Sequence, residues 1–271
     1  MKRLSIIILA ALLPLACIRE DRTKCPCYLH VDLGKVDRNY IGKVDLMLRE
    51  TDPYGIPEWY PVESKYIGDT LVMPVNKSEF DFCAWGNLRR SVVEGGLITP
   101  SAESPDSLWS CYRPISTRCE DVYITVIPER QFIPVTILVR GMIEGISAVR
   151  PVLVDAKSVF SVASQSRQAP GAIYPKEVSS PATGGSYYHF QSLLMTQERA
   201  TNLSLALSFV RDGRQVETSY PIGQMLLEQG EDISLSDRNP IIIDLVIGSA
   251  SVFLTIRIED WVTHAVIEIT I

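Results

Sequence analysis

This 271-residue chain lacks the common catalytic signatures. It has three histidines and no Gly-x-Ser-x-Gly segment, the sharp turn on which many hydrolases hold a serine nucleophile. It also has no Gly-x-Gly-x-x-Gly segment and no phosphate-binding loop. Adjacent acidic pairs such as Glu231-Asp232 would point to opposite faces of a strand, so they cannot flank one glycosidic bond. The sequence therefore predicts a protein that is not an enzyme and that needs no cofactor.

Concentrated positive charge and metal-binding spacing are also missing. The net charge is −6 at pH 7 and the basic residues are scattered, which excludes the basic stripe of a nucleic-acid-binding protein. Cys25-Pro-Cys27 has one intervening residue instead of the two of a zinc or redox pair, so no metal site is expected. Cys111 and Cys119 are a candidate disulfide, because flanking strands could bring their Cα atoms within ~4.4 to 6.8 Å.

Helical periodicity is scarce, whereas apolar and polar residues alternate through most of the chain. The alternation is clear over residues 29–33, 80–85 and 203–209, and each of these segments reads as a half-buried strand. Asp212-Gly213 follows the last of them and supplies a hairpin turn. Residues 222–229 form the one plausible short helix. Many short strands separated by turns predict an all-β protein built from β-sandwiches.

The N-terminus is the most informative part of what is present. Two basic residues precede an apolar run over residues 4–15, and a small residue then precedes Cys17. This pattern is typical of a secretory signal, and the run is too short to span a bilayer, which takes ~20 residues. Because bacterial lipoproteins carry their lipid on a cysteine directly after the cleavage point, we expect residues 1–16 to be removed and Cys17 to be acylated. The alternative is an ordinary secreted protein, since Pro14 stands where such signals usually have leucine.

The residues after Cys17 suggest a location and a domain organisation. Residues 18–21, Ile-Arg-Glu-Asp, resemble the export tag of lipoproteins that reach the outer face of the outer membrane. The expected location is therefore the cell outer membrane, with the protein lipid-anchored and facing the exterior. The remaining chain is long enough for two domains. Proline residues at 128 and 134 mark the boundary, which gives a tether over 17–27, an N-terminal β-sandwich over 28–128 and a C-terminal β-sandwich over 129–271.

Three short segments resemble the FimB-type family of fimbrial anchor subunits. They are Cys17 with the charged stretch and Cys25-Pro26 that follow it, the strand that ends in Ala84-Trp85-Gly86-Asn87, and Ile256-x-Ile258-x-x-Trp261 before an alternating last strand. The resemblance implies two tandem transthyretin-like β-sandwich domains. It also implies a surface lipoprotein that attaches the base of a fimbrium to the outer membrane and limits the length of the fimbrium.

The resemblance further implies that the partners are fimbrial stalk subunits, joined by strand addition. In that mode an extended segment of one subunit completes an open sheet of another, and main-chain hydrogen bonds supply much of the affinity. The final segment of this chain alternates up to its last residue. The candidate subunit contacts are Val262, Ala265, Ile267, Ile269 and Ile271.

The main alternative is a glycan-binding surface lipoprotein that serves an outer-membrane importer. Such a protein should display several aromatic side chains on one exposed platform. Trp59, Tyr60 and Tyr66 are the candidate aromatic trio.

Overall fold

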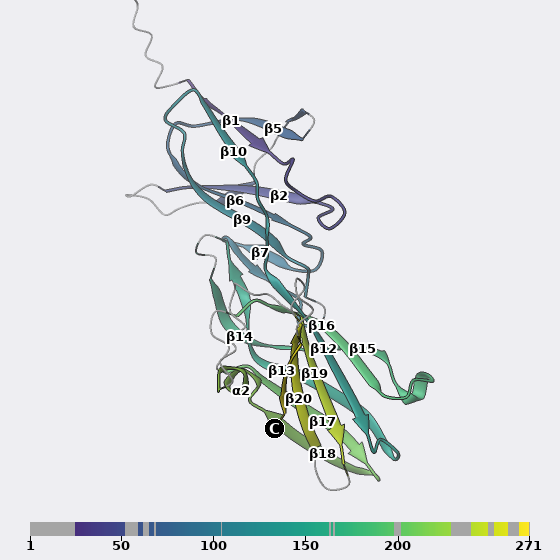
Figure 1. Ribbon diagram of the computed structural model, residues 1–271. Coiled ribbons are helices and arrows are strands. Elements are labelled where there is room, and N and C mark those ends of the chain that lie inside the picture. The colour runs from purple at the N-terminus through teal and green to yellow at the C-terminus, as the bar shows by residue number, and fades with distance from the viewer. Residues whose placement is uncertain are drawn as a thin grey trace, which may run out of the picture.

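The computed structural model describes residues 25–51, 59–61, 65–67, 69–103, 105–162, 164, 166–197, 202–228, 240–248, 252–259 and 266–270. These residues form an elongated molecule in which two β-sandwiches are stacked end to end, with the N-terminal sandwich at the top of Figure 1. In the described part of the chain, helical structure is limited to α2 (Ile222–Glu228) and the 3-10 turn η3 (Pro181–Thr183). The prediction of an all-β fold with one short helix near residue 222 is confirmed.

The N-terminal sandwich packs a four-stranded sheet on a five-stranded one. The first sheet has the order β10 (Asp121–Thr125), β1 (Cys27–Asp32), β5 (Thr70–Val75), β4 (Lys65–Ile67). The second has the order β11 (Glu129–Arg130), β9 (Trp109–Ser116), β6 (Glu79–Gly86), β2 (Val44–Glu50), β3 (Trp59–Pro61). Alternate residues of the strands, such as Leu29, Leu71 and Phe82, fill the space between the sheets, as the period-two pattern predicts. In the first sheet, β1 is parallel to β10 and antiparallel to β5.

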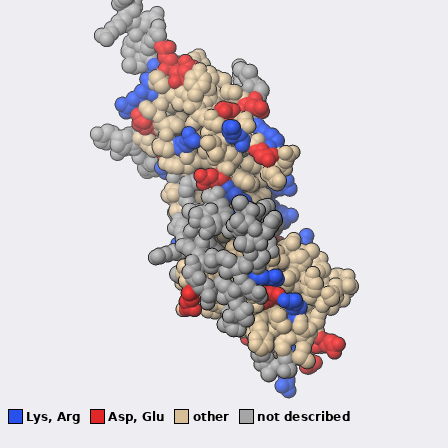
Figure 2. Space-filling view, in the orientation of Figure 1, with Lys and Arg blue, Asp and Glu red and all other residues tan. Residues whose placement is uncertain are grey.

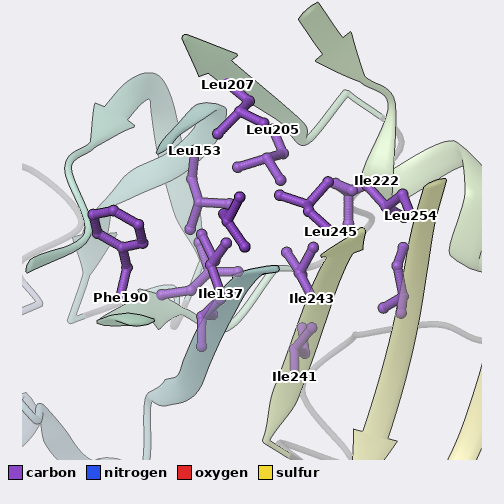
Figure 3. Packing of buried hydrophobic residues seen from close by; sticks show 14 of the residues in the cluster. Ile137, Leu153, Phe190, Leu205, Leu207, Ile222, Ile241, Ile243, Leu245 and Leu254 are labelled. Carbon is purple, nitrogen blue, oxygen red and sulfur yellow. The ribbon is translucent and has the colours of Figure 1, made fainter. Parts of the chain in front are cut away.

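The C-terminal sandwich has two six-stranded sheets. One has the order β15 (Lys176–Ser179), β16 (Tyr188–Met195), β12 (Phe132–Gly141), β19 (Ile241–Ile247), β20 (Val252–Glu259), β21 (Val266–Thr270). The other contains β18 (Arg214–Tyr220), β17 (Ser204–Arg211), β13 (Ile146–Ser161), β8 (Leu97–Thr99) and β7 (Val92–Glu94), with β14 (Arg167–Ile173) also paired to β13. Side chains from both sheets, among them Ile137, Leu205 and Leu245, point into one apolar core (Figure 3). The turn between β17 and β18 places Asp212 and Gly213 at φ values of 50° and 75°, as the sequence predicts for a hairpin.

The two sandwiches exchange short strands. β7 and β8 precede residue 128 in the sequence, yet β8 pairs with β13 in the C-terminal sandwich. In the opposite direction, β11 pairs with β9 in the N-terminal sandwich. A single domain boundary at residue 128 does not predict either of these strand pairings, because each joins segments that are distant in the sequence. Main-chain hydrogen bonds therefore join the two halves of the molecule in addition to the linker.

A third apolar cluster fills the junction between the sandwiches. It consists of Cys83, Trp85, Ile98, Leu108, Phe160, Val162 and Met195. The sequence reads β6 as half-buried, with Phe80, Phe82 and Ala84 facing inward. In the structure the opposite face of β6 is buried as well, because Cys83 and Trp85 pack in the junction cluster. The Cys83 thiol also lies 3.8 Å from the main-chain oxygen of Val162.

The Trp-Gly-Asn end of β6 has a packing reason for each residue. Trp85 packs in the junction cluster. Gly86 lies so close to Ile41 that an added Cβ would come within 2.4 Å of a methyl carbon of that residue. Asn87 takes a positive φ of 67°, and its side chain donates a hydrogen bond of 2.6 Å to the main-chain oxygen of Tyr40. The segment is thus a structural corner.

The junction cluster should contribute strongly to stability. We expect Phe160→Ala to lower the free energy of unfolding by about 3 to 5 kcal/mol, because the substitution leaves a cavity where a fully buried ring packs. The midpoint of urea unfolding measures the loss. Phe253→Ala is the control, since Phe253 is 53% exposed and its truncation should change stability by no more than about 0.5 kcal/mol. Equal midpoints for the two variants would contradict a role of this cluster in holding the sandwiches together.

Candidate functional site

The last strand of the chain, β21, lies at one edge of the sheet that runs from β15 to β21 in the C-terminal sandwich. β21 pairs with β20 in antiparallel register, so that Ile267 is opposite Ile258 and Ile269 is opposite Ile256. Both partner residues on β20 are buried. Two of the candidate subunit contacts, Ile267 and Ile269, therefore lie on an edge strand. The other three, Val262, Ala265 and Ile271, lie outside the described residues.

The opposite edge of the same sheet is protected against further pairing. β15 is four residues long, begins with exposed Lys176 and Glu177, and has an irregular register against β16 between Glu177 and Ser179. Short, charged and bulged edge strands resist the addition of another strand. A groove of about 590 Å³ lies beside β15, lined by residues of β12, β15 and β16 together with Glu103 and Pro105. The edge at β21 is the better candidate for a partner strand.

An aromatic group lies on the outer face of the first N-terminal sheet. The rings of His30 on β1 and Tyr123 on β10 stack at 4.3 Å, and Tyr123 is 75% exposed. The His30 Nε2 atom lies 2.8 Å from a carboxylate oxygen of Asp121. Tyr28, also exposed, is opposite Asp121 in the register. The parallel pairing of β1 with β10 brings these side chains together.

A buried carboxylate adjoins the junction between the sandwiches. Asp81 accepts a hydrogen bond of 2.9 Å from the Arg49 Nε–H group and one of 2.8 Å from the Tyr112 hydroxyl. Burial, and then the hydrogen bond to Asp81, raise the pKa of Tyr112 to about 12, so this phenol stays protonated at neutral pH. The three side chains satisfy one another, and the group reads as a structural ion pair rather than an acid–base centre.

The cysteines do not pair in the structure as the sequence suggests. Cys111 and Cys119 are both free: Cys111 is buried in the N-terminal core, and Cys119 is exposed in the turn before β10. β9 continues for five residues after Cys111, which carries the chain roughly 17 Å away before it turns. The neighbour of Cys119 is Cys27, the first residue of β1. This proximity follows from the pairing of β1 with β10.

Several residues that the sequence analysis singles out fall outside the described part of the structure. They are Cys17 and the side chains of Trp59, Tyr60 and Tyr66. Within the described residues, no cluster of three or more metal-ligating side chains occurs, and no helix has the length and apolarity needed to cross a membrane. On the face seen in Figure 2, acidic and basic side chains are interspersed, without a large continuous patch of either sign.

Comparison with known proteins gives a match at the level of structure. No family model and no curated protein sequence matches this chain. A candidate adhesin from Bacteroides ovatus superposes with a TM-score of 0.54 at 14% identity, over 93% of this chain and 97% of that one. A candidate polysaccharide-binding protein from Bacteroides thetaiotaomicron superposes with a TM-score of 0.55 at 12% identity, over 90% and 98%.

The fimbrial anchor protein Mfa2 from Porphyromonas gingivalis gives a similar match. Its TM-score is 0.56 at 13% identity, and the superposition covers 88% of this chain and 98% of Mfa2. This likeness agrees with the resemblance to fimbrial anchor subunits that the sequence itself shows. Along nearly its whole length, the chain therefore has the fold of a fimbrial anchor protein.

Proposed function

We propose that this protein is a fimbrial anchor subunit, a surface lipoprotein that holds the base of a fimbrium on the outer membrane and limits the length of the fimbrium. The observation that carries the proposal is the likeness in fold to the anchor protein Mfa2 over 88% of the chain, in a sequence that also has a lipoprotein-type cysteine at residue 17. Neither observation alone points to anchoring: the fold is shared with candidate adhesins, and a lipidated cysteine occurs in proteins of many functions.

The arrangement of the two sandwiches supports this role. β1, which begins ten residues after Cys17, belongs to the N-terminal sandwich, whereas the edge strand β21 belongs to the C-terminal sandwich (Figure 1). The first strand after the expected lipid attachment and the candidate subunit contact therefore lie on different halves of an elongated molecule. This separation would let one half face the membrane while the other half meets a filament.

Stalk subunits that join by strand addition are the proposed partners. A partner strand needs a sheet edge with free main-chain groups and little charge to repel it. The C-terminal sheet that contains β21 has two edge strands. β15 is short, bulged and charged, whereas β21 has the sequence Val-Ile-Glu-Ile-Thr. The β21 edge is therefore where we place the contact with the next subunit.

The decisive experiment removes the protein from the bacterium that makes it. Without the anchor, fimbriae should appear in the culture medium instead of on the cells, and electron microscopy should find them longer than normal. Restoring the gene should reverse both effects. Fimbriae that stay on the cells at their normal length would rule out the anchoring function.

Glycan binding is a second candidate, favoured by the aromatic group on the first N-terminal sheet. Stacked His30 and Tyr123, with Tyr28 and the Asp121 carboxylate beside them, combine exposed rings with a hydrogen-bond acceptor, as sugar-binding surfaces do. A solved structure of the same fold is itself described as a candidate polysaccharide-binding protein. If the protein binds glycans, the purified protein should be retained on a polysaccharide column. The anchoring function alone does not require such retention.

A further inference from the structure

Two cysteines that are distant in the sequence lie together where the chain enters the N-terminal sandwich. Cys27 is the first residue of β1 and is fully buried, whereas Cys119 is exposed in the turn before β10. Because β1 and β10 are parallel, with Tyr28 opposite Asp121, the start of β1 lies beside this turn. The Tyr28 N–H donates a hydrogen bond of 2.7 Å to the main-chain oxygen of Glu120 and fixes the approach.

The two thiols also act on each other. Burial raises the pKa of the Cys27 thiol, and the neighbouring Cys119 raises it further, both through its charge when ionised and through a hydrogen bond between the two side chains. The Cys119 sulfur lies 3.2 Å from the main-chain oxygen of Asp121, which holds that side chain close to β10. One accessible thiol and one sheltered thiol are therefore within reach of each other.

The other described cysteines are placed differently. Cys83 packs in the junction cluster and Cys111 lies in the N-terminal core, so neither is near this turn or open to an external oxidant. Cys25 is exposed and only two residues before Cys27. It is the one competitor among the described cysteines, and the experiment has to distinguish it from Cys27.

We propose that Cys27 and Cys119 form a disulfide that fastens the start of β1 to the turn before β10. The oxidant is an external disulfide, either of a small thiol or of a thiol oxidoreductase. The Cys119 thiolate attacks it, forms a mixed disulfide and releases one thiol. The Cys27 thiol then loses its proton to solvent and attacks the Cys119 sulfur, which releases the second thiol. Two protons and two electrons thus leave the protein and reduce one disulfide to two thiols.

Such a bridge would secure the strand through which the chain enters the fold. β1 is an interior strand, paired with β5 on one side and β10 on the other. Linking Cys27 to Cys119 closes a loop that contains most of the N-terminal sandwich and restricts the unfolded chain accordingly. The disulfide itself does not depend on the anchoring proposal. If that proposal also holds, tension from the lipid attachment would enter the sandwich at a covalent cross-link instead of peeling β1 from its neighbours.

The test uses the full-length protein in detergent, incubated with oxidised glutathione and then alkylated. Trypsin releases Cys119 in the peptide 119–130 and both Cys25 and Cys27 in the peptide 25–35. Mass spectrometry should find these two peptides joined in the wild type and in Cys25→Ser, but not in Cys27→Ala or Cys119→Ser. Oxidation should also raise the unfolding midpoint by roughly 10 °C, as expected for a long closed loop, and a reductant should reverse the shift.

Two outcomes would overturn the proposal. One is wild-type protein in which Cys119 carries only glutathione and stays unlinked to the peptide 25–35. The other is a link that survives in Cys27→Ala and disappears in Cys25→Ser, because the exposed neighbour would then be the true partner. Since each variant is compared with itself before and after reduction, a loss of stability caused by the substitution alone does not affect the result.

Discussion

Replacing Cys17 by alanine is expected to move the protein completely from the membrane fraction to the soluble fraction, or to leave an unprocessed precursor. The apolar run before Cys17 is too short to span a bilayer, so after cleavage the acyl chains on this cysteine would be the main attachment. Each buried methylene contributes ~0.8 kcal/mol, and two or more chains together give stable anchoring. Cell fractionation followed by mass spectrometry of the N-terminal peptide measures the result.

Cys25→Ala is the matched control for this experiment. Cys25 is exposed and close to the N-terminus, but it does not directly follow the expected cleavage point. The control should stay in the membrane fraction and keep its fatty acids. If Cys17→Ala remains membrane-bound and the wild-type peptide carries no fatty acid, the lipoprotein interpretation fails, and the proposal of anchoring loses its attachment point.

Local alternation predicted much of the C-terminal sandwich. Leu203, Leu205, Leu207 and Phe209 were expected on one face of a strand before an Asp-Gly turn, and all four are buried. Such features could be predicted because the two-residue period of a strand and the positive φ values of a tight turn are encoded in neighbouring residues. The same holds for α2, where the pattern around Leu226 marks an amphipathic helix of about two turns.

Contacts between distant segments explain what the sequence did not reveal. The second face of β6 is buried because Ile98 and Phe160, from β8 and β13, share a cluster with Cys83 and Trp85. The alternation within β6 indicates one buried face. It does not indicate that residues of β8 and β13 bury the second face.

The candidate sites also differ in whether they depend on local alternation or on contacts between distant segments. The edge strand that contains Ile267 and Ile269 was predicted from its own alternation, and it lies at the edge of the C-terminal sheet. The stack of His30 on Tyr123 and the approach of Cys27 to Cys119 were not predicted. Both depend on the parallel register of β1 with β10, which joins strands some ninety residues apart. The sequence of neither strand alone specifies that register.

Deleting residues 262–271 is expected to abolish the retention of fimbriae on the cells and to lower the unfolding midpoint by roughly 5 °C. β21 pairs with five residues of β20, so its removal leaves the main chain of β20 unpaired at the sheet edge. The same deletion removes the strand edge to which we assign the next subunit. Thermal unfolding measured by circular dichroism, and the share of fimbriae found in the medium, report the two effects separately.

Single substitutions test the pairing of the last strand without deleting it. Ile267 and Ile269 lie opposite buried residues of β20, so a lysine at either position should disturb the edge strand strongly. Thr270→Lys is the matched control, since it introduces the same charge at an alternate position of the same strand, and it should disturb the strand less.

A truncated protein that unfolds at the normal temperature and still holds fimbriae at the cell surface would show that the last strand has no part in assembly. A truncated protein that is destabilised but still holds fimbriae would instead assign β21 to the C-terminal sandwich alone, because the strand would then matter only to its own sheet. The contact with the next subunit would in that case have to lie elsewhere. The groove beside β15 would become the next candidate, since it adjoins the other edge of the same sheet.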